Sequence, residues 1–209
     1  MPYTFYMTTK RLFFALNATN PLATSFLPIY KKLRINADKK EISVKWVPPE
    51  NFHITLTFLG DMNVDYIPQI QEVLKKVCTE FSTFDLKIED VGAFSNEHDA
   101  RVLWLGVQNK RALNEFKNLL DQVLQAEGLF AGEMRDYKPH LTFGRLRNPR
   151  SVKDMISPFK RKSFGKLQVN EIVLYESKLE GNFPVYTPLL RVPLTGVSAE
   201  EEVSLELHP

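Results

Sequence analysis

The sequence contains a single cysteine, Cys78, among its 209 residues, so an intramolecular disulfide and a CxxC metal site are both excluded. Long hydrophobic runs are also missing. The apolar stretch from Leu12 to Leu16 is too short for the core of a signal peptide and far too short to cross a bilayer. These absences favour a reducing compartment, and we expect a cytoplasmic protein that does not enter the membrane.

Several motifs that carry chemistry are absent as well. There is no GxSxG nucleophile elbow and no P-loop of the GxxxxGK type. No nearby HxxxH pair, CxxC pair or carboxylate arrangement completes a set of three or four zinc ligands around His53 or His140. We therefore expect neither a metal nor another cofactor.

Neither sign of charge is in large excess, since 27 Lys and Arg oppose 25 Asp and Glu to give a net charge of +2. Four of the acidic residues lie in the last thirteen positions, which contain no Lys or Arg, so residues 1–196 carry +6. This mildly basic body suits an anionic partner but is far from the charge density of a duplex-DNA binder. Apolar residues at 44% and charged residues at 25% indicate a globular chain. We expect one domain over residues 1–196 and an acidic tail over 197–209.

Hydrophobic periodicity predicts a mixed chain of strands and helices. Asn20 and Pro21 resemble a cap and a first helical position. Pro188 and Pro193 favour an edge position for the last strand. The expected strands are 11–16, 42–47, one from His53, 84–94, 101–107, one from His140, 167–180 and 185–194, and the expected helices are one after Asn20, 67–77, 109–128 and 151–156.

Two of these strands begin with a histidine. In HITLTFLG, from His53, strict alternation places His53, Thr55 and Thr57 on one face and the apolar side chains of Ile54, Leu56 and Phe58 on the other. The stretch HLTFGR, from His140, repeats the order histidine, apolar, threonine, phenylalanine. One chemical face on each of two strands suggests one shared site.

The spacing around these strands indicates an internal duplication. Forty residues separate Phe13 from His53, and 37 separate Leu103 from His140, with strand, helix and histidine strand in the same order. Two such units packed about a pseudo-twofold axis would bring both polar strand faces to one cleft. Either motif alone is more often ordinary strand structure, because threonine is a common strand former. Their recurrence in matching positions favours function.

Paired histidines suit phosphodiester chemistry. Histidine has an ordinary pKa of about 6.5 and takes or gives a proton near neutral pH. A neutral ring can therefore activate water while a protonated one donates to the leaving oxygen. Thr55 and Thr142, two residues beyond each histidine on the same face, can donate hydrogen bonds to phosphate oxygens.

The segments WVPPENFHITLTFLG and YKPHLTFGR, with GAFSN and RVLWLGV between them, resemble the two-histidine phosphoesterases, and among them the RNA 2′,3′-cyclic phosphodiesterases, historically called 2′-5′ RNA ligases. The resemblance covers residues 11–195. It implies an α+β fold of two lobes, each with an antiparallel sheet flanked by helices, around a central cleft. It also implies metal-independent opening of cyclic phosphate ends to 2′-phosphates, on RNA or small cyclic nucleotides, by a protein expected to be a monomer.

The same resemblance implies roles for five residues. His53 corresponds to the proton donor and His140 to the proton acceptor, and Thr55 and Thr142 correspond to phosphate ligands. Arg145 matches a basic residue that often follows the second motif. Strict alternation points Arg145 away from His140, so it reaches the phosphate only if the strand ends or bulges near Gly144.

Other residues have two interpretations. Flanking cations can attract a polyanion or be ordinary solvated charges, and three aromatic residues can stack on a base or pack in the core. Two further histidines have no motif around them and are expected to be exposed. The cations are Arg135, Lys138, Arg147 and Arg150, the aromatic residues are Trp46, Phe94 and Tyr137, and the histidines are His98 and His208.

Two alternatives to hydrolysis remain open at this level. The protein could be an RNA- or nucleotide-binding module that keeps the cleft without turnover, although both histidines and both threonines are present. The same cleft could also run in reverse and join a 5′-hydroxyl end to a cyclic phosphate.

Overall fold

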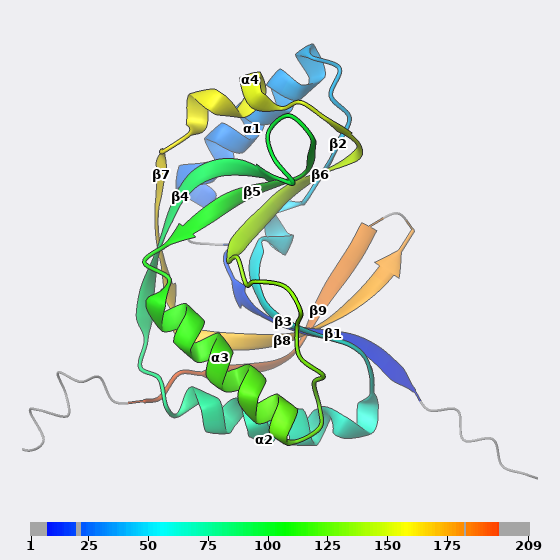
Figure 1. The fold of residues 1–209 in the computed structure, drawn as a ribbon, viewed down its shortest axis with the longest axis vertical. Coiled ribbons are helices and arrows are strands. Elements are labelled where there is room, and N and C mark those ends of the chain that lie inside the picture. Colours follow the sequence, from blue (N-terminus) through cyan, green and yellow to red (C-terminus); the bar gives the residue numbers. More distant parts are fainter. Residues whose placement is uncertain (1–7, 20–21, 182, 197–209) are drawn as a thin grey trace, which may run out of the picture.

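A computed structural model describes residues 8–19, 22–181 and 183–196 of the protein (Figure 1). Strands and helices alternate along much of the chain. The strands are β1 (Thr9–Asn17), β2 (Val44–Trp46), β3 (His53–Asn63), β4 (Phe84–Phe94), β5 (Ala100–Gln108), β6 (His140–Arg150), β7 (Ser163–Val169), β8 (Glu171–Glu180) and β9 (Phe183–Pro193). The helices are α1 (Ala23–Lys39), α2 (Ile67–Cys78), α3 (Arg111–Ala126) and α4 (Lys153–Ile156).

The strands form two antiparallel groups that meet at the two histidine-bearing strands. One group has the order β7-β4-β5-β6, with β2 also paired to β6, and the other has the order β3-β1-β8-β9. A single residue pair, Ile54 with Leu141, links β3 to β6. The α+β class is thus confirmed, and this pair joins the two antiparallel groups into one strongly curled sheet.

Helices α1 and α3 each pack against the strand group that does not contain the strand preceding them in the chain. Helix α1 follows β1 in the chain but packs beside β7 and α4, whereas α3 follows β5 but packs against β3 and α2 (Figure 1). The helices thus cover the outer faces of both groups, where the main core lies. That core includes the fully buried side chains of Phe14, Phe26, Phe116 and Phe143.

A second, smaller apolar cluster lies on the opposite face of the β1 group. It contains Phe13, Ala15, Val173 and Tyr175, with Tyr186 packed against it. Phe13 and Ala15 alternate along β1 with residues of the main core, so they point to the other side of the sheet. This inner face carries aromatic rings toward the middle of the molecule.

Most predicted elements are present, and one boundary is wrong. The expected strand 167–180 is two strands, β7 and β8, separated at Asn170. They pair with β4 and β1 respectively, so the chain passes from one strand group to the other at this residue. The edge position predicted for the last strand is confirmed for β9. The proposed cap at Asn20 and Pro21, and the acidic tail 197–209, lie outside the described residues.

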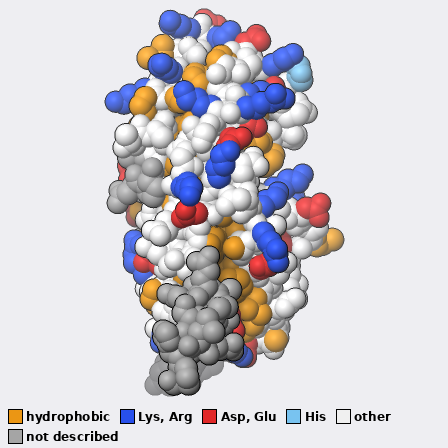
Figure 2. Space-filling model, turned by 90° about the vertical axis from the view of Figure 1, so that its left-hand side faces the viewer, with side chains coloured by type: hydrophobic (Ala, Val, Ile, Leu, Met, Phe, Trp, Pro, Cys, Tyr) orange, Lys and Arg blue, Asp and Glu red, His pale blue; other side chains and the backbone are white. Residues whose placement is uncertain are grey.

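Charge on the surface is mixed. On the face in Figure 2, Lys and Arg side chains are spread among Asp and Glu rather than gathered into one basic surface. None of the helices in the described part of the chain is long and apolar enough to cross a membrane.

Candidate active site

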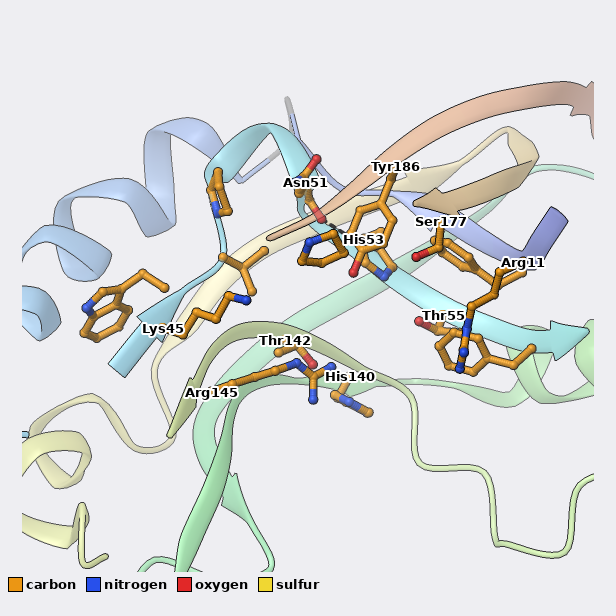
Figure 3. A pocket seen from close by; sticks show the side chains of 16 residues that line it. Arg11, Lys45, Asn51, His53, Thr55, His140, Thr142, Arg145, Ser177 and Tyr186 are labelled. Carbon is orange, nitrogen blue, oxygen red and sulfur yellow. Dashed lines mark hydrogen bonds between the residues drawn. The ribbon is translucent and has the colours of Figure 1, made fainter. Parts of the chain in front are cut away.

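A cavity of about 320 Å³ lies between the two strand groups. Its wall contains all five residues singled out by the sequence, namely His53, Thr55, His140, Thr142 and Arg145 (Figure 3). The two motifs, 87 positions apart, therefore contribute to one site, as their recurrence predicted. Further polar or aromatic side chains in its wall were not among the predicted site residues: Arg11, Phe13, Lys45, Asn51, Phe58, Ser177 and Tyr186.

The two histidines are held in the same way. His53 Nδ1 lies 2.7 Å from the carbonyl oxygen of Asn51, and His140 Nδ1 lies 2.7 Å from that of Lys138. Because a carbonyl oxygen only accepts, each Nδ1 carries the hydrogen and donates it. Nε2 of each ring is thereby the nitrogen left to exchange a proton with a bound molecule.

Burial lowers the pKa of both histidines, because it disfavours the charged imidazolium. Hydrogen bonding to the carbonyls of Asn51 and Lys138 opposes this effect, and the positive charge of Arg145 adds to it for both rings. His140 lowers the pKa of His53 further. The free site therefore favours neutral imidazoles at neutral pH, and a bound anion would favour protonation of one of them.

Each histidine strand contains a bulge one residue after its threonine. On β3, Thr55 pairs with Ala15 and Thr57 pairs with Phe14, so Leu56 is the extra residue. On β6, Thr142 pairs with Trp104 and Gly144 with Leu103, so Phe143 is the extra residue. An extra residue reverses the alternation of side chains beyond it.

This reversal corrects the expected faces. Thr57 is fully buried on the core side, where its hydroxyl donates to Asp121 Oδ1 at 2.6 Å. Phe58 is 52% exposed and lines the cavity, although alternation assigned it to the core. Arg145 reaches the cavity by the bulge that the sequence required for it.

The two cavity walls differ in chemistry at corresponding positions. Phe58 and Arg145 each lie five residues after their histidine. The Phe13 ring contacts the rings of His53 and Phe58, with centroids 5.3 and 5.5 Å apart, and Tyr186 meets His53 edge-on at 5.0 Å. The wall formed by β3, β1 and β9 is thus aromatic, while the β6 wall presents the guanidinium of Arg145.

Of the other described residues that the sequence singled out, only Trp46 lines the cavity. Trp46 lines the cavity and stacks on Phe143, whereas Phe94 meets His140 edge-on at 4.9 Å from outside the lining. Tyr137 is partly buried and packs against the core, and its hydroxyl donates to the carbonyl of Thr55 at 3.0 Å. His98 and the four flanking cations are exposed and do not line the cavity; these cations are Arg135, Lys138, Arg147 and Arg150. His208 lies outside the described residues.

Among residues 8–19, 22–181 and 183–196, no group of three His, Cys, Asp or Glu side chains is arranged to hold a metal ion. Most residues that sequence reasoning missed come from β1, β2, β8 and β9. Only the pairing of these strands with the motif strands brings them to the site. The aromatic residues of β1 and β9 were visible in the sequence, but no local pattern related them to His53.

Comparison with known proteins agrees with this geometry. Residues 30–180 match the family model described as the 2′-5′ RNA ligase superfamily. An RNA 2′,3′-cyclic phosphodiesterase of Archaeoglobus fulgidus is 35% identical over 181 residues, covering 86% of this chain and 97% of the relative. One from Methanothermobacter thermautotrophicus is 34% identical over 152 residues, covering 71% and 82%.

Solved structures share the fold. A crystal structure of a Thermus thermophilus protein matches with a TM-score of 0.75 at 24% identity, covering 90% of this chain and 100% of that one. The structure of E. coli LigT complexed with 3′-AMP matches with a TM-score of 0.65 at 24% identity, covering 90% and 99%. The match to the family model spans more than half of the sequence, and the chain belongs to the 2′-5′ RNA ligase superfamily.

Proposed function

We propose that the protein is an RNA 2′,3′-cyclic phosphodiesterase that opens the cyclic phosphate at an RNA end to a 2′-phosphate. The observation that carries the proposal is the matched pair of histidines in one cavity, each with Nδ1 tied to a carbonyl and Nε2 left for proton transfer. The relatives that share 35% and 34% of their residues with this chain are named for the same reaction.

In this mechanism the two rings divide the proton transfers. Neutral His140 takes a proton from water through Nε2 as the water oxygen forms a bond to phosphorus. The bond from phosphorus to O3′ breaks, and protonated His53 gives its Nε2 proton to O3′. The protons balance, since one ring gains a proton and the other loses one.

Thr55, Thr142 and Arg145 act on the non-bridging phosphate oxygens. Both threonine hydroxyls and the guanidinium donate hydrogen bonds, and the negative charge on these oxygens increases toward the transition state. Arg145 is the one member that adds a positive charge to this set. Its charge thus stabilises the transition state more than the bound substrate.

The aromatic wall supports His53 as the acid. In a 2′,3′-cyclic phosphate the leaving O3′ belongs to the ribose, so the acid lies on the nucleoside side of the phosphorus. Phe13 and Tyr186 surround His53 with the apolar ring surface that a nucleoside favours. Water then approaches phosphorus from the side of His140.

The test is turnover of the four nucleoside 2′,3′-cyclic phosphates, with separation of the 2′- and 3′-monophosphate products. We expect 2′-monophosphate, and a loss of at least ~10²-fold in kcat for His53→Ala and for His140→Ala. His98→Ala is the matched control, because His98 is exposed and outside the cavity lining. Near-normal activity in either cavity variant would refute the mechanism, and binding without turnover by the wild type would favour a non-catalytic binding module.

The superfamily description gives one reason to test a second activity, RNA ligation. A 5′-hydroxyl in place of water, with His140 again taking the proton from the attacking oxygen and His53 again giving one to O3′, would join two RNA ends. Incubation with paired ends, one with a 5′-hydroxyl and one with a cyclic phosphate, separates joining from hydrolysis by product length.

A further inference from the structure

The cavity extends past the residues used in the proposed mechanism. In Figure 3, Arg11 and Ser177 lie at the Thr55 end, Lys45 lies at the opposite end, and the histidines lie between them. A cyclic phosphate held by both motifs would leave the Arg11 end free. The residues there come from β1, β3 and β8, and the first two of these strands also contribute to the aromatic wall.

Phe58 is unusual for a solvent-exposed position, and Arg11 lines the same cavity. Phe58 is 52% exposed, and among the large exposed apolar side chains of the described residues it alone lines this cavity. Arg11 is exposed, and no side-chain hydrogen bond or ion pair joins it to another described residue. An exposed aromatic ring and a guanidinium without a described partner, both in the wall of one cavity, match the base and the phosphate of a nucleotide.

Phe58 and Arg11 are held in place by the strands from which they project. The bulge at Leu56 turns Phe58 into the cavity, and the ring packs on Phe13, whose own side chain is 1% exposed. Arg11 lies on β1 two residues before Phe13, on the same face of the strand. Both groups thus project from paired strands, which fixes their positions relative to His53.

We propose that Phe58 and Arg11 form a subsite for the RNA chain that leads to the cyclic end. Phe58 stacks on the base of the terminal nucleotide, and Arg11 binds the phosphodiester on its 5′ side. The inference depends on the proposed function, because the polarity follows from a ribose beside His53. The subsite makes an oligonucleotide end a better substrate than a cyclic mononucleotide, which has no 5′ phosphodiester.

The experiment compares three substrates: a nucleoside 2′,3′-cyclic phosphate, a dinucleotide with the same cyclic end, and that dinucleotide with an uncharged methylphosphonate linkage. For Arg11→Gln we expect KM for the natural dinucleotide to rise about tenfold, the size of one charge-assisted hydrogen bond. The change for the mononucleotide and the methylphosphonate should be several times smaller. Arg101→Gln, at an exposed strand position outside the cavity, is the matched control and should change none of the three.

Phe58 is tested by Phe58→Leu and Phe58→Tyr. We expect Leu to raise KM about tenfold for all three substrates, since each contains the terminal base, and Tyr to restore it. Equal effects of Arg11→Gln on mononucleotide and dinucleotide, or no effect on either, would overturn the subsite while leaving hydrolysis intact. Failure of the proposed function gives a different result, because the wild type would then cleave none of the three substrates.

Discussion

We predict that Asp121 on α3 stabilises the fold, because it binds side chains on the core side of the active-site strand β3. Its carboxylate accepts a hydrogen bond from Thr57 Oγ1 at 2.6 Å and one from Lys117 Nζ at 2.5 Å. Thr57 is fully buried and Lys117 is 4% exposed. The ammonium group also lies 5.0 Å from the centre of the Tyr137 ring, and the Tyr137 hydroxyl binds the carbonyl of Thr55.

Replacing Asp121 by alanine lowers the free energy of unfolding because it leaves the Lys117 ammonium and the Thr57 hydroxyl without this partner. Removing one partner of a buried ion pair costs about 3–5 kcal/mol, and an unsatisfied buried hydroxyl costs about 1–3 kcal/mol. Two features reduce the total: Glu133 lies 3.5 Å from the Lys117 ammonium and keeps part of its pairing, and the Asp121 side chain is 15% exposed. We expect a loss of about 3–4 kcal/mol in the free energy of unfolding.

Urea unfolding followed by circular dichroism measures this loss, provided that the slope with denaturant stays unchanged. Adding Lys117→Met to Asp121→Ala removes the stranded charge, so the double variant should lose much less than the sum of the single losses. The matched control is Glu115→Ala on the same helix, which breaks the exposed pair with Arg111 and should leave the urea midpoint unchanged. If Asp121→Ala lowers the midpoint no more than Glu115→Ala, the argument from burial fails.

Three further predictions concern catalysis. Burial, with Arg145 and for His53 also His140, lowers the pKa of both histidines. Activity falls as pH rises because the acid loses its proton, and it falls as pH decreases because the base gains one. Because both pKa values are lowered, both changes occur below the ordinary histidine pKa. We therefore expect the bell-shaped pH profile of kcat/KM to centre below about pH 6.5, whichever ring is the acid. A centre well above that value would contradict the use of these two histidines as the acid and the base. Arg145→Gln should reduce kcat about 10²-fold and move the centre upward, because a positive charge that lowers both pKa values is gone, whereas Arg145→Lys should keep the centre. Excess EDTA should leave kcat unchanged, and a loss of rate that zinc restores would show a metal enzyme instead.

The sequence predicted those parts of the fold that depend on local pattern. The amphipathic helices α2 and α3 and the strands with alternating apolar residues lie within a few positions of the expected ranges. The break at Asn170 was missed because both sides of it have strand character, and only the different partners of β7 and β8 separate them. The crossing of α1 and α3 between strand groups was also beyond local reasoning, since it depends on which apolar faces meet.

The site was predictable to the extent that it repeats. Two copies of one short motif led to a shared cavity, because packing alone does not require a histidine and a threonine in matching places. Tyr186 and Arg11 occur once each and have no counterpart in the other half, so no pattern distinguished them from surface residues. Their relation to His53 arises from strand order, with β9 and β1 on the same side of β3.

The two bulges explain how a repeated framework forms an asymmetric site. Period two selects Thr57 and Gly144 for the cavity, but one extra residue on each strand selects Phe58 and Arg145 instead. The residues before the bulge are constrained on both faces, since one face packs in the core and the other carries the histidine and threonine. The position five residues after each histidine meets neither constraint and is free to differ. In the proposed mechanism, phenylalanine on one side and arginine on the other let the same cavity distinguish the nucleoside from its phosphate. That difference would give a direction to a reaction whose two histidines are otherwise equivalent.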